Sequence, residues 1–140
     1  MSAKNKALVK RWFKEVWDDG RVETIDELYH PKGLAYGLVD GGAKPVRGPK
    51  EFKAFHANFR AAMPDMKVKI LNAYSEGEAV IVRCSVTGTH AGDTLGIKAT
   101  RKKVKFEGIS ILHIRNGKIV ESWNHYDFMK FYLEIGLLQK

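Results

Sequence analysis

Apolar and polar residues alternate along the last third of the chain, between residues 103 and 127, and the alternation is interrupted by Asn116-Gly117. This dipeptide between two alternating runs is a strong signal for a β-hairpin, because both residues accept the positive φ angles of its turn. Alternation with a period of two places successive side chains on opposite faces of a sheet. The pattern therefore predicts two long antiparallel strands, each with one buried face.

Apolar residues recur at helical spacing in four other segments. This periodicity predicts helices over residues 4–19, 25–29 and 49–63, and a final helix over residues 128–138. We expect Gly20 to end the first helix, Thr24 and Glu27 to form a capping box on the second, and Pro49 to open the third.

Further strands are predicted over residues 34–38, 66–75 and 79–90, with loops over residues 39–48 and 91–101. Helices come first and long antiparallel strands follow, without repeats or a linker. This order is typical of an α+β fold in which helices pack on one face of a curved sheet. The length of 140 residues suits one domain spanning residues 1–140.

Three hairpin residues, Ser110, Ser122 and Asn124, are polar where a purely structural sheet would carry aliphatic side chains. Alternation assigns to the inner face Phe106, Gly108, Ser110, Leu112, Val120, Ser122, Asn124 and Tyr126. It assigns to the outer face Ile109, Ile111, His113, Ile119, Glu121, Trp123 and His125. The inner face is predicted to line a ligand pocket, and the apolar outer face to form a homodimer interface.

The formal net charge of +8 raises the question of nucleic-acid binding. The basic residues are scattered, however, and the one tight run, residues 101–103, stands at a loop-to-strand junction. Lysines at such a place are typical of a protected sheet edge. No nucleic-acid partner is therefore predicted.

Three features predict a cytoplasmic protein without a membrane partner. No apolar stretch reaches the length of a membrane span, and the first residues lack the apolar centre of an export signal. The single cysteine, Cys84, has no disulfide partner in the chain and is expected to be a buried, unreactive thiol.

Several short motifs follow one another in a recognisable order. They are Val9-Lys10-Arg11-Trp12-Phe13, Gly48-Pro49-Lys50-Glu51-Phe52, Met63-Pro64-Asp65, Thr87-Gly88-Thr89-His90, Leu95-Gly96-Ile97 and Asn116-Gly117-Lys118-Ile119-Val120-Glu121-Ser122-Trp123. In this order they resemble the SnoaL-like polyketide cyclase branch of the nuclear transport factor 2-like superfamily, over nearly the whole chain.

The resemblance implies a cone-shaped α+β barrel, in which a strongly bent antiparallel or mixed sheet wraps around the N-terminal helices. It also implies an apolar pocket at the wide end and a homodimer formed through the outer sheet face. The prototype cyclases use an Asp on the last strand as general acid/base, helped by a His on the preceding strand. Those positions correspond here to Asn124 and Ser110, neither of which titrates near neutral pH.

The candidate catalytic residues are Asn124, His56 and Asp127. The candidate ligand-binding residues are Tyr36, Ser110, Ser122, Tyr126, Phe106, Phe59 and Trp17. Each has a structural alternative: Asn124 as a buried amide satisfied within the fold, His56 as a core residue, Asp127 as a helix cap, and the aromatic residues as core.

Two functions stay open at this point. One is a cofactor-free isomerase, cyclase or hydratase acting on an apolar, oxygen-bearing substrate. The other is a non-catalytic binding module for an apolar metabolite. A cavity without a titrating group favours the binding module. No metal or nucleotide cofactor is predicted, because the sequence contains neither metal-ligand spacing nor a glycine-rich phosphate loop.

Overall fold

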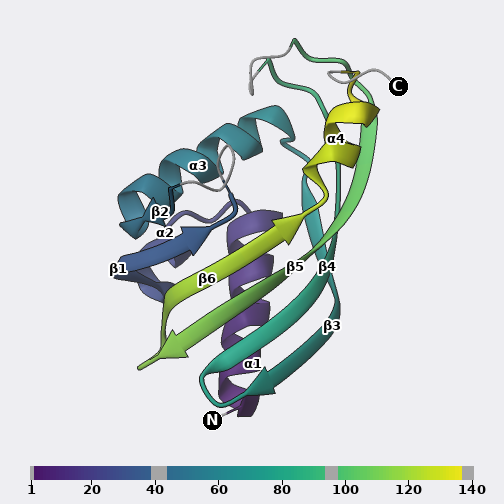
Figure 1. Ribbon diagram of the computed structural model, residues 1–140. Coiled ribbons are helices and arrows are strands. Elements are labelled where there is room, and N and C mark those ends of the chain that lie inside the picture. Colours follow the sequence, from purple (N-terminus) through teal and green to yellow (C-terminus); the bar gives the residue numbers. More distant parts are fainter. Residues whose placement is uncertain (1, 39–43, 94–97, 137–140) are drawn as a thin grey trace.

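The computed structural model describes residues 2–38, 44–93 and 98–136 (Figure 1). Its elements, in chain order, are α1 (Ser2–Trp12), the π-helical segment η1 (Phe13–Asp18), α2 (Glu23–Leu28), β1 (Tyr29–Tyr36), β2 (Val46–Arg47), α3 (Gly48–Ala62), β3 (Lys67–Glu76), β4 (Ala79–Thr89), β5 (Lys103–Arg115), β6 (Lys118–Tyr126) and α4 (Phe128–Glu134).

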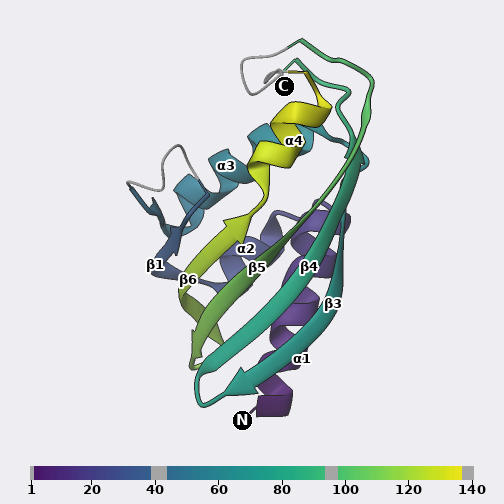
Figure 2. The same ribbon diagram turned by 45° about the vertical axis from the view of Figure 1, so that its right-hand side comes forward.

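The strands form one six-stranded sheet in the order β2-β1-β6-β5-β4-β3. Its neighbouring strands are antiparallel except β1 and β6, which run parallel. The sheet curves around the N-terminal helices (Figures 1 and 2). The predicted α+β fold with a bent, mixed sheet is thus confirmed, although the sheet is open between its edge strands β2 and β3. No helix within the described ranges is long and apolar enough to cross a membrane.

The core lies between the helices and the concave face of the sheet. Val9 and Val16, on α1 and η1, are fully buried there, as are Val80 and Val82 on β4. Large apolar side chains contribute about 1.5–3 kcal/mol each when they are removed from water. The predicted buried face of α3 is confirmed, because Phe52, His56 and Phe59 all point into this core.

A β-bulge changes the alternation at the start of β6. His113 pairs with Glu121, whereas the next residue, Ile114, pairs with Ile119, so that Val120 is an extra residue on β6. Because one extra residue reverses the faces of the residues before it, Ile119 is buried and lines the core side of the sheet. The prediction that Val120 points inward and Ile119 outward was therefore wrong.

The second helix begins earlier than the sequence suggests. Its N-cap is Val22, which makes no side-chain cap, and Thr24 is the buried second residue of the helix. The Thr24 hydroxyl donates to Glu15 Oε1 at 2.6 Å and accepts from Arg21. The predicted capping box was wrong, because Thr24 ties α2 to η1 instead of capping its own helix.

The end of the first helix is held by side chains from elsewhere in the chain. The imidazole Nε2 of His56 donates to Val16 O at 2.6 Å, and the guanidinium of Arg60 donates to Trp17 O at 2.8 Å. The last residues of any helix leave carbonyl groups without a partner inside the helix. Here α3 supplies the missing donors, and η1 is thereby fixed against α3.

Other differences concern element boundaries. The first strand begins at Tyr29 and not at residue 34, since the chain is already extended where the second helix was expected to end. The final helix ends at Glu134 within the described residues, and the predicted part up to residue 138 lies partly outside them, as do parts of both long loops.

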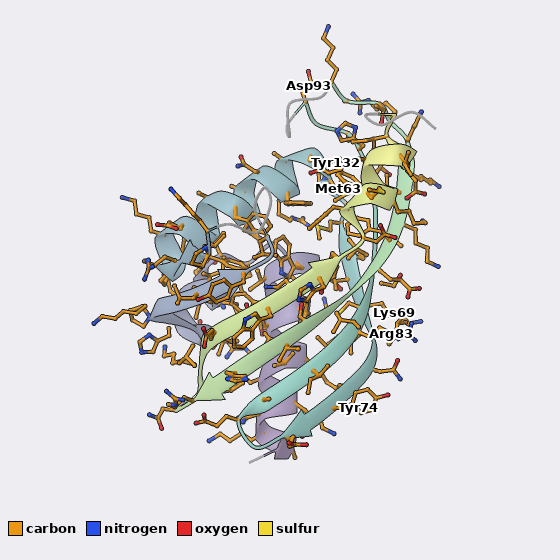
Figure 3. The ribbon with its side chains drawn as sticks, viewed as in Figure 1. Met63, Lys69, Tyr74, Arg83, Asp93 and Tyr132 are labelled. Atoms are coloured by element: carbon orange, nitrogen blue, oxygen red, sulfur yellow. The ribbon has the colours of Figure 1, made fainter. Side chains whose placement is uncertain are left out.

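The outer face of the sheet is partly apolar. Ile109 is 43% exposed and Tyr74 is 60% exposed, while Lys69 and Arg83 give the neighbouring positions of β3 and β4 a polar character (Figure 3). Trp123 on this face is flanked by Tyr36 and His113, with ring centroids 5.9 and 5.0 Å away. The homodimer through this face stays a prediction.

Candidate functional site

An apolar cavity lies between the helices and the concave face of the sheet. Its helical wall is aromatic and consists of Trp12, Phe13, Trp17, Phe52, Phe55 and Phe59. Its sheet wall includes Val68, Val86, Phe106 and Leu112. The cavity leaves about 60 Å³ accessible to the centres of water-sized molecules. Since one water needs only about 10–15 Å³ by this measure, there is room for a small organic molecule.

Four polar side chains of the cavity lining lie together on the paired strands β5 and β6. Ser110 and Asn124 are direct cross-strand partners, and the Ser110 hydroxyl donates to Asn124 Oδ1 at 2.8 Å. The Tyr126 hydroxyl lies 3.0 Å from Ser110 Oγ. The amide nitrogen of Asn124 donates to Ser122 Oγ at 3.2 Å and to the backbone oxygen of Tyr36 at 2.9 Å. We call Ser110, Ser122, Asn124 and Tyr126 the polar cluster.

Glycine at position 108 makes the position of Tyr126 possible. The two residues are cross-strand partners, and a Cβ at residue 108 would lie 2.2 Å from Tyr126 Cδ2. The Tyr126 ring therefore lies against the bare backbone of β5. The Tyr126 hydroxyl also contacts the thiol of Cys84. Burial raises the pKa of that thiol to about 11. The expectation of a buried, unreactive cysteine agrees with this position.

The cavity walls are electrically neutral near pH 7. Among the described residues, no Asp, Glu, His, Lys or Arg lines the cavity. Its tyrosines stay protonated, because burial raises the pKa of both Tyr29 and Tyr126 far above the usual range. Within the same residues, no three His, Cys, Asp or Glu side chains gather closely enough to hold a metal ion. The arrangement can orient an oxygen-bearing ligand, but it offers no side chain that exchanges protons readily.

Seven of the ten candidate site residues meet at this cavity. They are Trp17, Phe59, Phe106, Ser110, Ser122, Asn124 and Tyr126. The three others lie elsewhere. His56 is buried beside the cavity wall and donates to Val16 O, while burial lowers its pKa.

Tyr36 and Asp127 also lie outside the lining of the cavity. The ring of Tyr36 stacks on Trp123 at 5.9 Å on the outer face of the sheet, and only its backbone oxygen reaches Asn124. Asp127 is exposed and accepts a hydrogen bond from the backbone nitrogen of Lys130 at 3.0 Å. That contact makes it the N-cap of α4.

Some lining residues were not among the candidates. Val68 and Val86 line the cavity from β3 and β4, and the period of two on those strands could have identified them. Ile119 was missed because of the bulge. Tyr29 was assigned to the end of a helix, and nothing in the local pattern indicates that its ring packs against both Trp12 and Phe52.

The hydrogen bonds of the polar cluster require a side chain at position 124 that both donates and accepts, as an amide does. We expect Asn124→Asp to lower the free energy of unfolding at pH 7 by about 1–3 kcal/mol, the usual cost of an unsatisfied buried polar group. A carboxylate cannot donate to the Tyr36 oxygen 2.9 Å away, whereas a protonated carboxyl group can. The cost should therefore shrink between pH 7 and pH 4, as measured by urea unfolding of both proteins.

The matched control for this substitution is Asn72→Asp on the outer sheet face. The Asn72 oxygen accepts from Arg83 Nε at 2.9 Å. An aspartate at this position keeps that hydrogen bond and places a negative charge beside the Arg83 guanidinium. Its stability should stay within about 0.5 kcal/mol of wild type. Equal stability of Asn124→Asp and wild type at pH 7 would show that the Tyr36 contact imposes no requirement for an amide.

Comparison with known proteins places this geometry in a family. The SnoaL-like polyketide cyclase family matches residues 7–135. The chain is 25% identical over 130 residues to the aklanonic acid methyl ester cyclase DnrD of Streptomyces peucetius, covering 92% of this chain and 88% of that protein. It is 24% identical over 121 residues to the nogalonic acid methyl ester cyclase of Streptomyces nogalater, covering 86% and 89%.

Solved structures agree on the fold. A SnoaL-like protein from Jannaschia sp. CCS1 superposes with a TM-score of 0.88 at 23% identity, over 99% of this chain and 95% of that one. The family match, the bent sheet over N-terminal helices and the apolar cavity between them are consistent with one another. The chain belongs to the SnoaL-like polyketide cyclase family.

Proposed function

We propose that the protein binds a small, neutral, mainly apolar molecule that carries at least one oxygen atom. The observation that carries this proposal is the neutral, mainly apolar lining of the cavity, with the polar cluster on the paired strands β5 and β6. Aromatic residues such as Trp17, Phe59 and Phe106 would pack against the ligand skeleton. The polar cluster would fix its orientation, as a few placed polar groups do in most small-molecule sites.

The absence of a cation among the described lining residues bears on the charge of the ligand. A carboxylate transferred from water into an apolar site without a partner costs several kcal/mol. In this cavity the nearest polar partners would be hydroxyl and amide groups, which only partly replace water. A neutral ketone, ester or alcohol avoids this cost, so the lining favours an uncharged ligand.

Cofactor-free cyclisation or isomerisation is the second candidate. The named relatives are cyclases, and a neutral hydroxyl donor in the polar cluster can stabilise negative charge that develops on a carbonyl oxygen. Proton abstraction from carbon, however, needs a base of suitable pKa. Asn124 stands where the resemblance predicts the catalytic carboxylate, and it cannot take that role. Binding without catalysis is therefore the function that this cavity supports best.

The proposal is tested with 1-indanone and indane-1-carboxylate at pH 7, by quenching of the tryptophan fluorescence of the cavity wall. We expect 1-indanone to bind with one molecule per chain and the carboxylate to bind at least about 100-fold more weakly, which corresponds to roughly 3 kcal/mol. The carboxylate should gain affinity as the pH is lowered towards its own pKa. Equal affinities at pH 7, or no binding of the ketone, would contradict the proposal.

The same ketone separates binding from catalysis. An enzyme that enolises its substrate exchanges the C2 protons of bound 1-indanone with D2O, and proton NMR follows that exchange directly. We expect no exchange above the buffer rate with the wild-type protein. Exchange that saturates with protein concentration would instead support the cyclase or isomerase function.

A further inference from the structure

The hydrogen bonds of the polar cluster have a fixed donor-to-acceptor direction. The starting point is the backbone oxygen of Tyr36, which can only accept, and which lies 2.9 Å from the side-chain amide of Asn124. The amide nitrogen of Asn124 must therefore face Tyr36. This fixes the amide oxygen on the other side, where it accepts from the Ser110 hydroxyl at 2.8 Å.

The donors of the remaining hydrogen bonds follow from the number of hydrogen atoms that each group carries. Ser110 has one hydroxyl hydrogen, and Asn124 Oδ1 accepts it, so the contact of 3.0 Å between Ser110 and Tyr126 requires Tyr126 to donate. The amide of Asn124 has two hydrogen atoms: one reaches Tyr36, and the other reaches Ser122 Oγ at 3.2 Å. Every hydrogen of Tyr126, Ser110 and the Asn124 amide is thus committed within the protein.

Ser122 is the last acceptor in this series of hydrogen bonds. Its oxygen accepts from Asn124, and its own hydrogen has no acceptor among the described residues. The side chain is 5% exposed and lines the cavity. A buried hydroxyl without an acceptor gains a full hydrogen bond when a ligand oxygen arrives, because no competing contact has to be broken.

We propose that Ser122 is the specificity-determining donor of the site, which binds a ketone or ester carbonyl oxygen of the ligand. This inference rests on the proposed binding function and names the group that the polar cluster recognises. The other cluster members hold Ser122 in place and present acceptor atoms only. A ligand carbonyl is therefore expected to lie beside Ser122 rather than beside Asn124.

The test compares 1-indanone with indane, which has the same ring skeleton without the carbonyl. In Ser122→Ala, the affinity for 1-indanone should fall about three- to tenfold, as for one neutral hydrogen bond, while the affinity for indane stays within about twofold of wild type. The carbonyl stretching band of bound 1-indanone should move to higher wavenumber, because its hydrogen bond is gone. Infrared difference spectra of the complexes measure that band.

Ser85→Ala is the matched control, since Ser85 is 7% exposed on β4 but does not line the cavity. It should leave the affinity ratio and the band unchanged. If Ser122→Ala does not fold, Ser122→Cys supplies the same readout, because its weaker thiol donor should shift the band part of the way.

An unchanged ratio and an unchanged band in a folded Ser122 variant would overturn this inference, while binding of both probes would still support the proposed function. No binding of either probe to the wild-type protein would overturn both proposals.

Discussion

Replacing His56 by alanine is expected to lower the free energy of unfolding by about 3–5 kcal/mol, the range for removing a large buried ring. His56 is 2% exposed, and its ring centroid lies 4.9 Å from that of Trp17. Alanine leaves a void at this contact. It also removes the donor that lies 2.6 Å from Val16 O, in a region without access to water. Urea unfolding followed by circular dichroism measures the loss.

Two control variants separate the ring from the hydrogen bond. His56→Gln keeps a donor but not the ring, and its stability should lie between wild type and His56→Ala. His125→Ala removes an exposed histidine from β6 and should cost less than about 0.5 kcal/mol. A loss below 1 kcal/mol for His56→Ala, together with abolished ligand binding, would assign His56 to the ligand rather than to the helix end.

The protonation of His56 gives this prediction a pH dependence. Burial lowers the pKa of His56 in the folded chain, so the fold favours the neutral ring. The stabilisation is present above the pKa of the unfolded state, about 6.5, and is lost as the pH falls through the lowered folded-state pKa. The slope of stability against pH below 6.5 should become shallower in His56→Gln. His90, whose pKa burial also lowers, retains part of the slope.

Replacing Gly37 by alanine is expected to lower the free energy of unfolding by about 2–5 kcal/mol and to weaken binding of 1-indanone. The φ angle of Gly37 is +84°, a left-handed conformation that costs other residues about 1–2 kcal/mol. A Cβ at this position would lie 2.0 Å from the backbone oxygen of Asn124, and relieving such a clash costs a further 1–3 kcal/mol or so. The necessary shift moves Asn124 within the polar cluster.

Gly77→Ala isolates the backbone part of this effect. Gly77 also has a positive φ of +57°, but nothing lies within 4 Å of a Cβ built on it. Its alanine variant should lose only about 1–2 kcal/mol and should bind 1-indanone normally. Equal losses of stability in the two variants, with equal binding, would argue that the approach of Gly37 to Asn124 has no role in the site.

The sheet side of the site could be predicted because alternation is a local property. Alternation along each strand puts Ser110 and Asn124 on the inner face. The extra residue Val120 then shifts the pairing that begins at Arg115 and Lys118, so that Ser110 lies opposite Asn124. The same reasoning failed at Ile119, because a bulge depends on pairing across two strands and leaves no signal in either strand alone. Alternation thus predicted the residues of the polar cluster and missed Ile119, the wall residue next to the bulge.

The helical side was harder, because a periodic stripe identifies a buried face but not the partner of each side chain. His56 lies on the predicted stripe of α3, yet its partner is a carbonyl group at the end of η1, 40 residues earlier. Whether a buried histidine faces a ligand or a backbone oxygen is decided by the packing of two helices. The sequence likewise left open whether Asp127 reaches the pocket or caps a helix. The structure shows that Asp127 is the N-cap of α4.

The side-chain donors at the end of η1 have a consequence for how the domain folds. Val16 O, Trp17 O and Asp18 O are bound by residues that lie 40, 43 and 49 positions later in the chain. Contacts over such separations form only after long loops have closed, and they tend to form late in folding. The first helix can begin on its own, but its last turn is completed only when α3 and β3 have docked. Trp17, and with it one wall of the cavity, therefore becomes ordered together with the whole domain.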